Sequence, residues 1–289
     1  MLYHIRHRPL RGGLRLLLSA IAFLLLSVLV AGSRVVSAEE VIEVDIPGVT
    51  RLEVRGGSQV ELSQGEPGLW VRGSRKDLDK VPYMANAGGL VLGYSRKHRR
   101  ESFPDVKFRV TLPDIEEIEI KGSGVIYVRS FDVQDLQVNL KGSGDARLHD
   151  LRGENLGLRV SGSGDIQVVK AEVRSLQAVL AGSGDIDIGT LAADSAEIVV
   201  QGSGDMRVQS ASLLEDLALS IVGSGGVDLA GMPARDAKVN IVGSGDARLG
   251  ELSGSLDVTV LGSGSVLYSG DVRERATILG SGRVKRRNE

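Results

Sequence analysis

The chain has 289 residues, no cysteine, 3% aromatic residues and a formal net charge of −2. The lack of cysteine excludes disulfides and thiolate metal sites, and the scarcity of aromatic side chains argues against stacking platforms for single-stranded nucleic acid. Residues 1–38 contain five arginines and no acid, which leaves 30 of the 35 basic and all 37 acidic side chains, a net charge of −7, on the rest. An acidic surface of this kind is unfavourable for nucleic-acid binding.

Residues 1–38 have the order of a secretory signal peptide. A basic start is followed by the uncharged, mostly apolar run from Leu16 to Val30 and by the small residues of Val36-Ser37-Ala38. This order predicts cleavage after Ala38 and export to the periplasm, the cell surface or the extracellular space. The alternative is an uncleaved anchor helix, which would be the chain's only contact with a membrane, since the apolar run is near the minimum length for a span.

Residues 39–115 are predicted to form an N-terminal β-rich region of the same domain. Apolar and polar residues alternate, with the period of a half-buried strand, over 41–46, 52–55, 60–62 and 106–110. Glycine pairs at 56–57 and 88–89 punctuate these segments. No segment after residue 38 has the pattern of a helix.

A basic run, Arg-Lys-His-Arg-Arg, occupies residues 96–100 between two of these strands. Such a run can bind an anionic polymer or lipid headgroups. A mobile, solvated loop is the alternative interpretation.

The tripeptide Gly-Ser-Gly recurs nine times in residues 116–289, at intervals of 18 to 21 residues. The copies begin at Gly122, Gly142, Gly162, Gly182, Gly202, Gly223, Gly243, Gly262 and Gly280. Positions two and four residues before each copy are always apolar, and alternation resumes after it. A fixed period indicates stacked units, and alternation on both sides of a corner indicates two short strands that face one core. A third short segment then returns the chain to the next unit. The repeat therefore predicts an all-β, single-domain, right-handed parallel β-helix (solenoid), with about 20-residue rungs and Gly-Ser-Gly corners.

The glycines have a mechanical explanation, because a sharp corner needs φ values that a Cβ resists and stacked corners crowd one another. The serines between them are not predicted as nucleophiles, since no base can be paired with any one of them. His98 and His149 are the only histidines after residue 38, and they lie far apart in the sequence.

Five corners continue as Gly-Ser-Gly-Asp, at 142–145, 162–165, 182–185, 202–205 and 243–246. This repeated corner, with the lead-in Val-Thr-Leu-Pro-Asp-Ile at 110–115, resembles the bacterial GIN-domain family, labelled "putative auto-transporter adhesin". The resemblance covers essentially the whole chain after the signal peptide. It implies an exported β-helical domain with an adhesive role.

Aspartates at 145, 165, 185 and 205 follow four consecutive corners. In register, their carboxylates would lie about 4.8 Å apart and repel by about 1 kcal/mol in water. We expect Asp145, Asp165, Asp185 and Asp205 each to accept backbone N–H groups of its own turn. The alternative is a column that binds Ca²⁺, although Gly226 and Ser265 interrupt it. No catalytic residue and no cofactor is predicted.

The residue immediately before each corner is predicted to point outward, and it becomes apolar towards the C-terminus. The affected residues are Val222, Val242, Leu261 and Leu279, and Leu267 adds to them on the next face. Contiguous exposed apolar area often marks an interface, here with a protein partner or with a second copy of the chain. Cover by the chain's own tail or N-terminal segment is the alternative.

The sequence thus predicts an exported, non-enzymatic, β-helical cell-envelope protein with a structural or adhesive role. One alternative is an ion- or ligand-binding envelope protein that uses the aspartate column. Another is a carbohydrate-active β-helix enzyme, which the constant rung length disfavours, because such enzymes build a cleft from long lateral loops.

Overall fold

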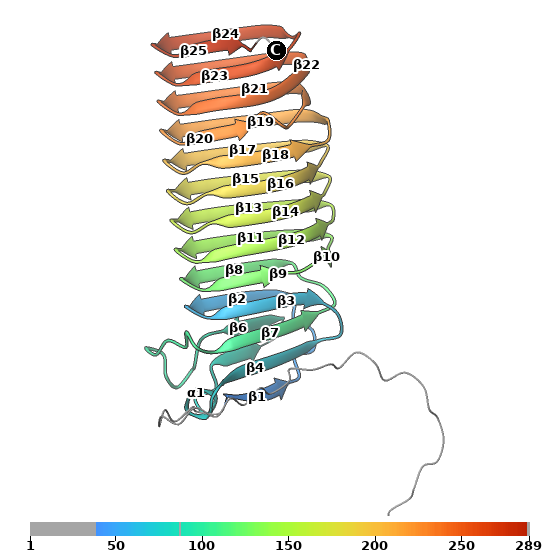
Figure 1. The fold of residues 1–289 in the computed structure, drawn as a ribbon, viewed down its shortest axis with the longest axis vertical. Coiled ribbons are helices and arrows are strands. Elements are labelled where there is room, and N and C mark those ends of the chain that lie inside the picture. Colours follow the sequence, from blue (N-terminus) through green and yellow to red (C-terminus); the bar gives the residue numbers. More distant parts are fainter. Residues whose placement is uncertain (1–38, 87, 288–289) are drawn as a thin grey trace, which may run out of the picture. The chain divides into compact units, whose positions relative to one another are not determined.

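The computed structural model describes residues 39–86 and 88–287, all of which lie in one compact unit, Ser37–Glu289. The predicted signal peptide lies outside the described residues. The described chain is nearly all β-strand and forms a β-solenoid of about eight turns (Figure 1). The predicted fold class is confirmed.

The N-terminal elements form the base of the solenoid. They are β1 (Glu39–Val44), β2 (Arg51–Gly56), β3 (Gln59–Gln64), β4 (Gly68–Ser74), α1 (Arg75–Leu78), β5 (Tyr83–Asn86), β6 (Gly89–Leu92) and β7 (Lys107–Leu112).

The regular rungs follow, each with one strand before a corner and one after it. The strands before corners are β8 (Glu117–Gly122), β11 (Asp135–Gly142), β13 (Asn155–Gly162), β15 (Ser175–Gly182), β17 (Ser195–Gly202), β19 (Leu214–Gly223), β21 (Ala234–Gly243) and β24 (Arg273–Gly280). The strands after corners are β9 (Val125–Val128), β12 (Asp145–Arg152), β14 (Ile166–Glu172), β16 (Ile186–Ala192), β18 (Met206–Ala211), β20 (Gly226–Leu229), β23 (Ser265–Gly270) and β25 (Arg283–Arg286). The long strand β22 (Asp246–Gly262) supplies one of each, and β10 (Phe131–Asp132) is a short pairing beside β12.

Strands before corners pair in parallel with one another, and so do strands after corners. We call the first set the leading sheet and the second the trailing sheet. The apolar columns of both sheets meet in one core, where for example Ile118, Val138 and Leu158 align and are buried. In β12 the register skips His149, so that Leu148 and Leu151 both face inward and a short third side forms.

The base is stacked out of chain order. Strand β2 pairs in parallel with both β6 and β8, and β3 pairs with both β7 and β9. The rung of β6 and β7 therefore lies outside the rung of β2 and β3, although it follows it in the sequence. Beyond it, β4 and β1 continue one sheet in antiparallel fashion and β5 the other. These antiparallel strands cover the rung edges at this end, which would otherwise be open for pairing.

Several elements of the base were not predicted. The helix α1 is a single turn whose N-cap, Ser74, accepts the N–H of Asp77 at 3.3 Å, and one turn is too short to show a period in the sequence. Adjacent buried residues break the alternation in β4 and β6, and β5 has no buried residue that would mark an inward face.

The two glycines of each corner differ in backbone conformation. The first has a φ between +120° and +146° in all nine copies, which favours glycine. The second has no positive φ, but from Gly144 onward a Cβ there would lie 1.9 to 2.5 Å from the carbonyl oxygen of the equivalent glycine in the preceding corner. The expectation of strained φ values and of crowding is thus confirmed. From Gly142 onward the first glycine is required on both grounds, since a Cβ there would also lie 2.1 to 2.4 Å from the carbonyl oxygen of the equivalent glycine in the preceding corner, whereas the second is required by crowding alone. Gly56 aligns with Gly122 and has a φ of +69°, so the first rung turns in the same place.

The last described rung departs from the predicted core. Ile278 aligns with the buried Val260 but is 41% exposed, because none of the described residues stacks on β24 at its outer edge. Its position in the repeat makes it inward, and its exposure reflects its place at the end of the stack.

Candidate interaction surfaces

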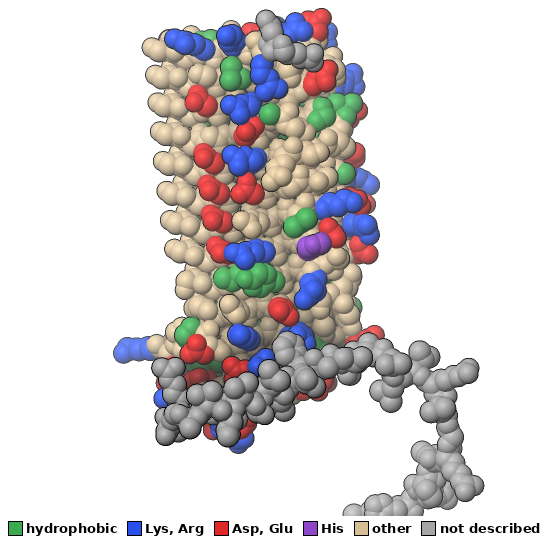
Figure 2. Space-filling model, viewed as in Figure 1, with side chains coloured by type: hydrophobic (Ala, Val, Ile, Leu, Met, Phe, Trp, Pro, Cys, Tyr) green, Lys and Arg blue, Asp and Glu red, His purple; other side chains and the backbone are tan. Residues whose placement is uncertain are grey.

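The aspartates after the corners form hydrogen bonds between rungs. Asp165 Oδ1 accepts the backbone N–H of Asp185 at 2.9 Å, and Asp185 Oδ1 accepts that of Asp205 at 2.9 Å. The series continues from Asp205 to Gly226 at 2.8 Å and resumes between Asp246 and Ser265 at 2.8 Å. Figure 2 shows this file of acidic side chains beside the corners.

The expectation that each aspartate would bond its own turn was wrong. The strand ladder is interrupted at the corner, so a backbone N–H of the next rung needs another acceptor, and the carboxylate below supplies it. Gly226 and Ser265 have no carboxylate, but their backbone N–H groups still donate to the aspartates of the preceding corners. Asp145 differs, with Oδ2 3.8 Å from Nη2 of Arg147. No group of three or more metal-ligating side chains is close enough to hold a metal ion within residues 39–287 as described.

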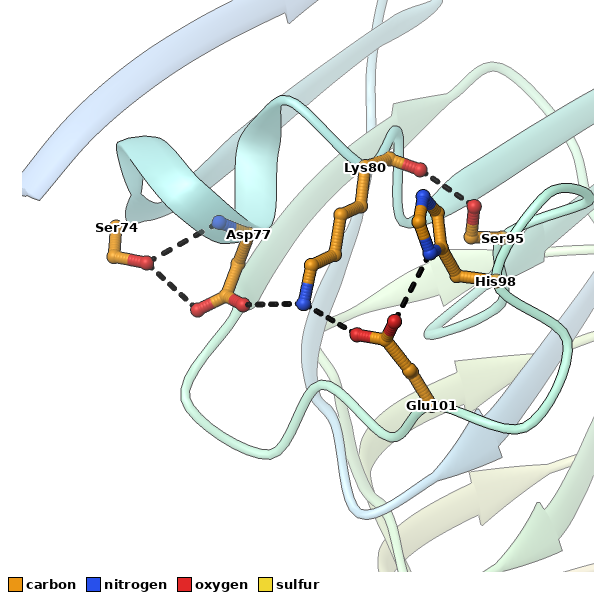
Figure 3. Close-up of polar contacts among 6 residues, drawn as sticks. All are labelled: Ser74, Asp77, Lys80, Ser95, His98 and Glu101. Carbon is orange, nitrogen blue, oxygen red and sulfur yellow. Dashed lines mark hydrogen bonds and ion pairs between the residues drawn. The ribbon is translucent and has the colours of Figure 1, made fainter.

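A polar cluster ties the connection between β6 and β7 to the base (Figure 3). The ammonium of Lys80 contacts the carboxylate of Glu101 and lies 3.8 Å from Oδ1 of Asp77. Glu101 also bonds Nδ1 of His98 at 2.9 Å, and Ser95 Oγ donates to the carbonyl oxygen of Lys80 at 2.5 Å. The hydrogen bond between Lys80 and Glu101 raises the pKa of the ammonium and lowers the pKa of the carboxyl.

The basic run 96–100 is therefore held at both of its ends. Ser95 is buried on one side, and on the other Phe103 is buried and its carbonyl oxygen accepts a bond from Ser58 Oγ at 3.2 Å. Between these anchors four cationic side chains are exposed, namely Arg96, Lys97, Arg99 and Arg100.

The predicted interface residues separate into two locations. On the leading sheet Val222, Val242, Leu261 and Leu279 are aligned neighbours, with exposed fractions of 44%, 45%, 41% and 72%. We call these four the apolar column. Leu267 is half-buried on the trailing sheet, where it aligns with Arg248 and Lys285. The structure therefore brings four of the five residues together and leaves Leu267 on another face.

Two charged columns that lie on the same face as the apolar column were not predicted. They lie five and seven residues before each corner and include Asp216, Lys238, Asp257 and Arg273. The fixed offset of these residues from the corner is visible in the sequence. Which columns share a face, and which charges lie next to each other, follows only from the strand pairing.

The trailing sheet carries a shallow depression where Gly226 interrupts the aspartate file. It is lined by acids and bases in alternation, and Arg248 Nη1 lies 3.3 Å from Oδ2 of Asp228. Such exposed pairs contribute little to stability. The described residues include no helix long and apolar enough to cross a lipid bilayer.

Comparisons with known proteins agree with this architecture. A family model described as "Putative auto-transporter adhesin, head GIN domain" matches residues 49–233 and 211–271. A search of curated proteins finds no match.

Solved structures share the fold at low sequence identity. A "putative adhesin" of Parabacteroides merdae has a TM-score of 0.68 at 18% identity, covering 86% of this chain and 96% of its own. Two proteins of Parabacteroides distasonis each cover 86% of this chain and 97% of their own. One, described as a "Putative lipid binding protein", has a TM-score of 0.64 at 22% identity. The other, a "putative adhesin", has a TM-score of 0.63 at 16% identity.

Proposed function

This chain belongs to the head GIN domain family, and from that membership we propose that it is an exported, non-enzymatic protein of the cell envelope with an adhesive role. The solved structures described as adhesins support the proposal. The order of residues 1–38, with a basic start, an apolar run and a small-residue cleavage site, supports export.

The observation that carries the proposal is the constancy of the rungs. From β11 onward the leading strands align residue for residue, and the described connections between strands are four residues or shorter, so the described rungs have no long lateral loop that could enclose a substrate. Small-molecule sites are usually concave pockets, whereas an extended, flat face favours contact with another extended surface. Adhesion is the function that such faces serve best.

Adhesion can be measured with beads that carry the folded full chain. We expect them to be retained on immobilised bacterial envelope fractions more strongly than beads that carry a corner variant with a disrupted fold, Gly184→Val. Equal retention of the two bead types would refute the adhesive role. A parallel assay for reducing ends released from polysaccharides is expected to show no activity, and turnover in that assay would favour the enzyme instead.

Export can be tested separately, by fusing residues 1–38 to a reporter phosphatase that is active only outside the cytoplasm. We expect activity from the wild-type fusion and its loss in Leu24→Arg, which places a charge in the apolar run. A cytoplasmic wild-type fusion would contradict the proposal.

The basic run favours a second candidate, the binding of anionic lipid surfaces. Four exposed cations on an anchored connection form a compact positive patch, and one solved structure with this fold is described as lipid binding. Vesicles that contain anionic lipid are expected to bind the full chain more strongly than neutral ones at low salt, and replacing residues 96, 97, 99 and 100 by glutamine should abolish the difference. The matched control removes four cations from the trailing sheet, by glutamine at Arg147, Arg152, Arg207 and Arg248. If the control variant loses binding equally, net charge is responsible rather than the basic run.

A further inference from the structure

The outer face of the leading sheet has an ordered pattern over its last four rungs, which are β19, β21, the second half of β22, and β24. Four outward columns cross these rungs in register. In rung order they are Val222, Val242, Leu261, Leu279, then Ser220, Asn240, Thr259, Thr277, then Ala218, Lys238, Asp257, Arg275, and finally Asp216, Asp236, Ser255, Arg273.

These columns are complementary to themselves. Consider a twofold axis just above the outer face of the leading sheet. It runs parallel to the strands, over the line between β21 and β22, and it places the same face of a second copy on the first. The rotation keeps every column in place but exchanges β21 with β22 and β19 with β24. Lys238 then meets Asp257 of the second copy, and Asp216 meets Arg273. In the apolar column, Val242 meets Leu261 and Val222 meets Leu279.

We propose that this face is an interface between two copies of the chain, which pack with their long axes antiparallel. Each charge contact occurs twice under the rotation, as an isologous interface requires. Among the described residues Asp216, Lys238, Asp257 and Arg273 form no ion pair within their own chain, so all four remain available. The apolar column supplies the contact that excludes water, and the charges fix the orientation.

The shape of the face fits the same arrangement. Ala218 leaves a depression of about 400 Å³ whose lining includes Glu197, Asp216 and Lys238. The twofold places Arg275 of the second copy over Ala218, where its guanidinium would face two carboxylates. Guanidinium and carboxylate groups form the stronger class of hydrogen bonds. A small residue thus lies opposite a large one, and acid lies opposite base.

The rest of the leading sheet does not continue the pattern. In the preceding rungs the column before the corners reads Lys141, Ser161, Ala181 and Gln201. The face therefore spans four rungs, about 19 Å, by seven residues, about 23 Å, a footprint of roughly 440 Å² per copy. That lies below the roughly 800 Å² per partner of a standard interface, so we infer a weak dimer that dissociates on dilution.

The test is sedimentation velocity on the full chain over a range of concentrations. We expect monomer and dimer in exchange, without larger species, because a twofold closes at two copies. A wild-type chain that stays monomeric up to several hundred micromolar, or that forms an open-ended series of oligomers, would overturn the proposal.

Charge reversal identifies the face. In Lys238→Asp, two aspartates oppose two others across the interface, and in Asp257→Lys, lysines oppose lysines. Each variant alone is expected to dimerise about tenfold more weakly, because two exposed pairs change from attraction to repulsion. A mixture of the two variants is expected to restore dimers, since both contacts of each heterodimer then join a carboxylate of one copy to an ammonium of the other. A contact within one chain cannot give this result, and failure of the mixture to associate would refute the interface.

Two further variants separate the apolar contribution from general surface effects. Val242→Lys is expected to prevent dimerisation, whereas Val169→Lys, at a valine of the trailing sheet that is 54% exposed against 45% for Val242, is expected to leave it unchanged. Equal loss in both would show that the association does not use this face. Thermal melts of all variants verify folding, and if Val242→Lys does not fold, the charge-reversed mixture remains decisive.

Discussion

The second glycine of a corner offers the sharpest test of how the solenoid is held together. We consider Gly184→Ala, in the middle of the stack. Its φ is not positive, so alanine adds no intrinsic backbone strain. The added Cβ would, however, lie 2.0 Å from the carbonyl oxygen of Gly164, whereas real Cβ atoms stay beyond 3.0 Å. The two corners must therefore separate by about 1 Å.

That separation disturbs the hydrogen bonds that cross the same gap. Ser183 N–H and Gly184 N–H both donate to the carbonyl oxygen of Gly162, at 2.9 and 3.3 Å, and Asp185 N–H donates to Asp165 Oδ1 at 2.9 Å. Each such bond is worth about 1 kcal/mol. With the displaced packing beneath the corner, we expect the free energy of unfolding to fall by about 3–5 kcal/mol, and the Tm by about 10 °C.

The assay is a thermal melt followed by circular dichroism, with two controls. Gly65→Ala changes a glycine that also lacks a positive φ, but its new Cβ would be 3.8 Å from the nearest heavy atom, the Cβ of Thr111. We expect it to alter stability by less than about 1 kcal/mol. Ser183→Ala, at an exposed position of the same corner, is expected to be similarly mild. If Gly184→Ala melts like these controls, crowding between corners does not determine the use of glycine there.

Four other predictions concern the ends of the stack and its charges. Gly282→Ala, with a Cβ 2.5 Å from Gly264 O, is expected to cost less than Gly184→Ala in the same melts, because in a linear array a terminal rung can detach alone. The hydrogen bond to Glu274 raises the pKa of Tyr268 to about 12, so absorbance at alkaline pH should show a phenol that ionises near this value, and Glu274→Gln should lower that pKa towards the ordinary value of tyrosine. The pKa of Glu101 is lowered in the folded protein. Its contribution to stability is therefore complete above the pKa of the unfolded state and is lost as pH falls through the pKa of the folded state. Glu101→Gln should flatten the acid side of a stability–pH curve, and an unchanged curve would contradict a stabilising role of the cluster. Melts in millimolar Ca²⁺ and in chelator are expected to agree within a few degrees, since ligand linkage would otherwise separate them.

The repeated part of the fold could be predicted because every rung meets the same neighbours. Once Gly-Ser-Gly fixes the corner, the parity of each residue relative to it decides whether the side chain is inward or outward. Leu140, Val160 and Leu180 are therefore buried in one column, and Lys141 and Gln201 are outward. Long-range pairing, usually hard to infer, is here reduced to a shift of one period.

The base could not be predicted in the same way. Strands β6 and β7 have no Gly-Ser-Gly between them, and a 14-residue connection replaces the corner. The local sequence does not indicate whether the rung of β6 and β7 lies outside the rung of β2 and β3 or between that rung and the rung of β8 and β9. The position of this rung depends on the antiparallel pairing of β1, β4 and β5 at the same end, and that pairing exists only in the folded structure.

The aspartate file shows a finer limit. The sequence placed Asp165, Asp185 and Asp205 in one column, but an aspartate beside a turn has donors both in its own turn and in the next rung. The choice depends on which N–H is left without a partner, and that is set by where the ladder breaks. The break at the corner leaves the N–H of the next rung unpaired, and Oδ1 takes it.

The difference between inward and outward columns indicates where functional residues should be sought in a solenoid. Packing constrains the inward columns and the corner glycines, so their regularity carries no information beyond the fold. Outward columns are free of that constraint and are expected to be mostly polar, as in the column of Lys141, Ser161, Ala181 and Gln201. Four successive apolar residues from Val222 to Leu279 depart from that expectation. They lie in the same rungs as Lys238 and Asp257, which are on opposite sides of the proposed twofold axis between β21 and β22. The apolar and the charged columns become self-complementary about the same axis, which is what an interface between two copies requires.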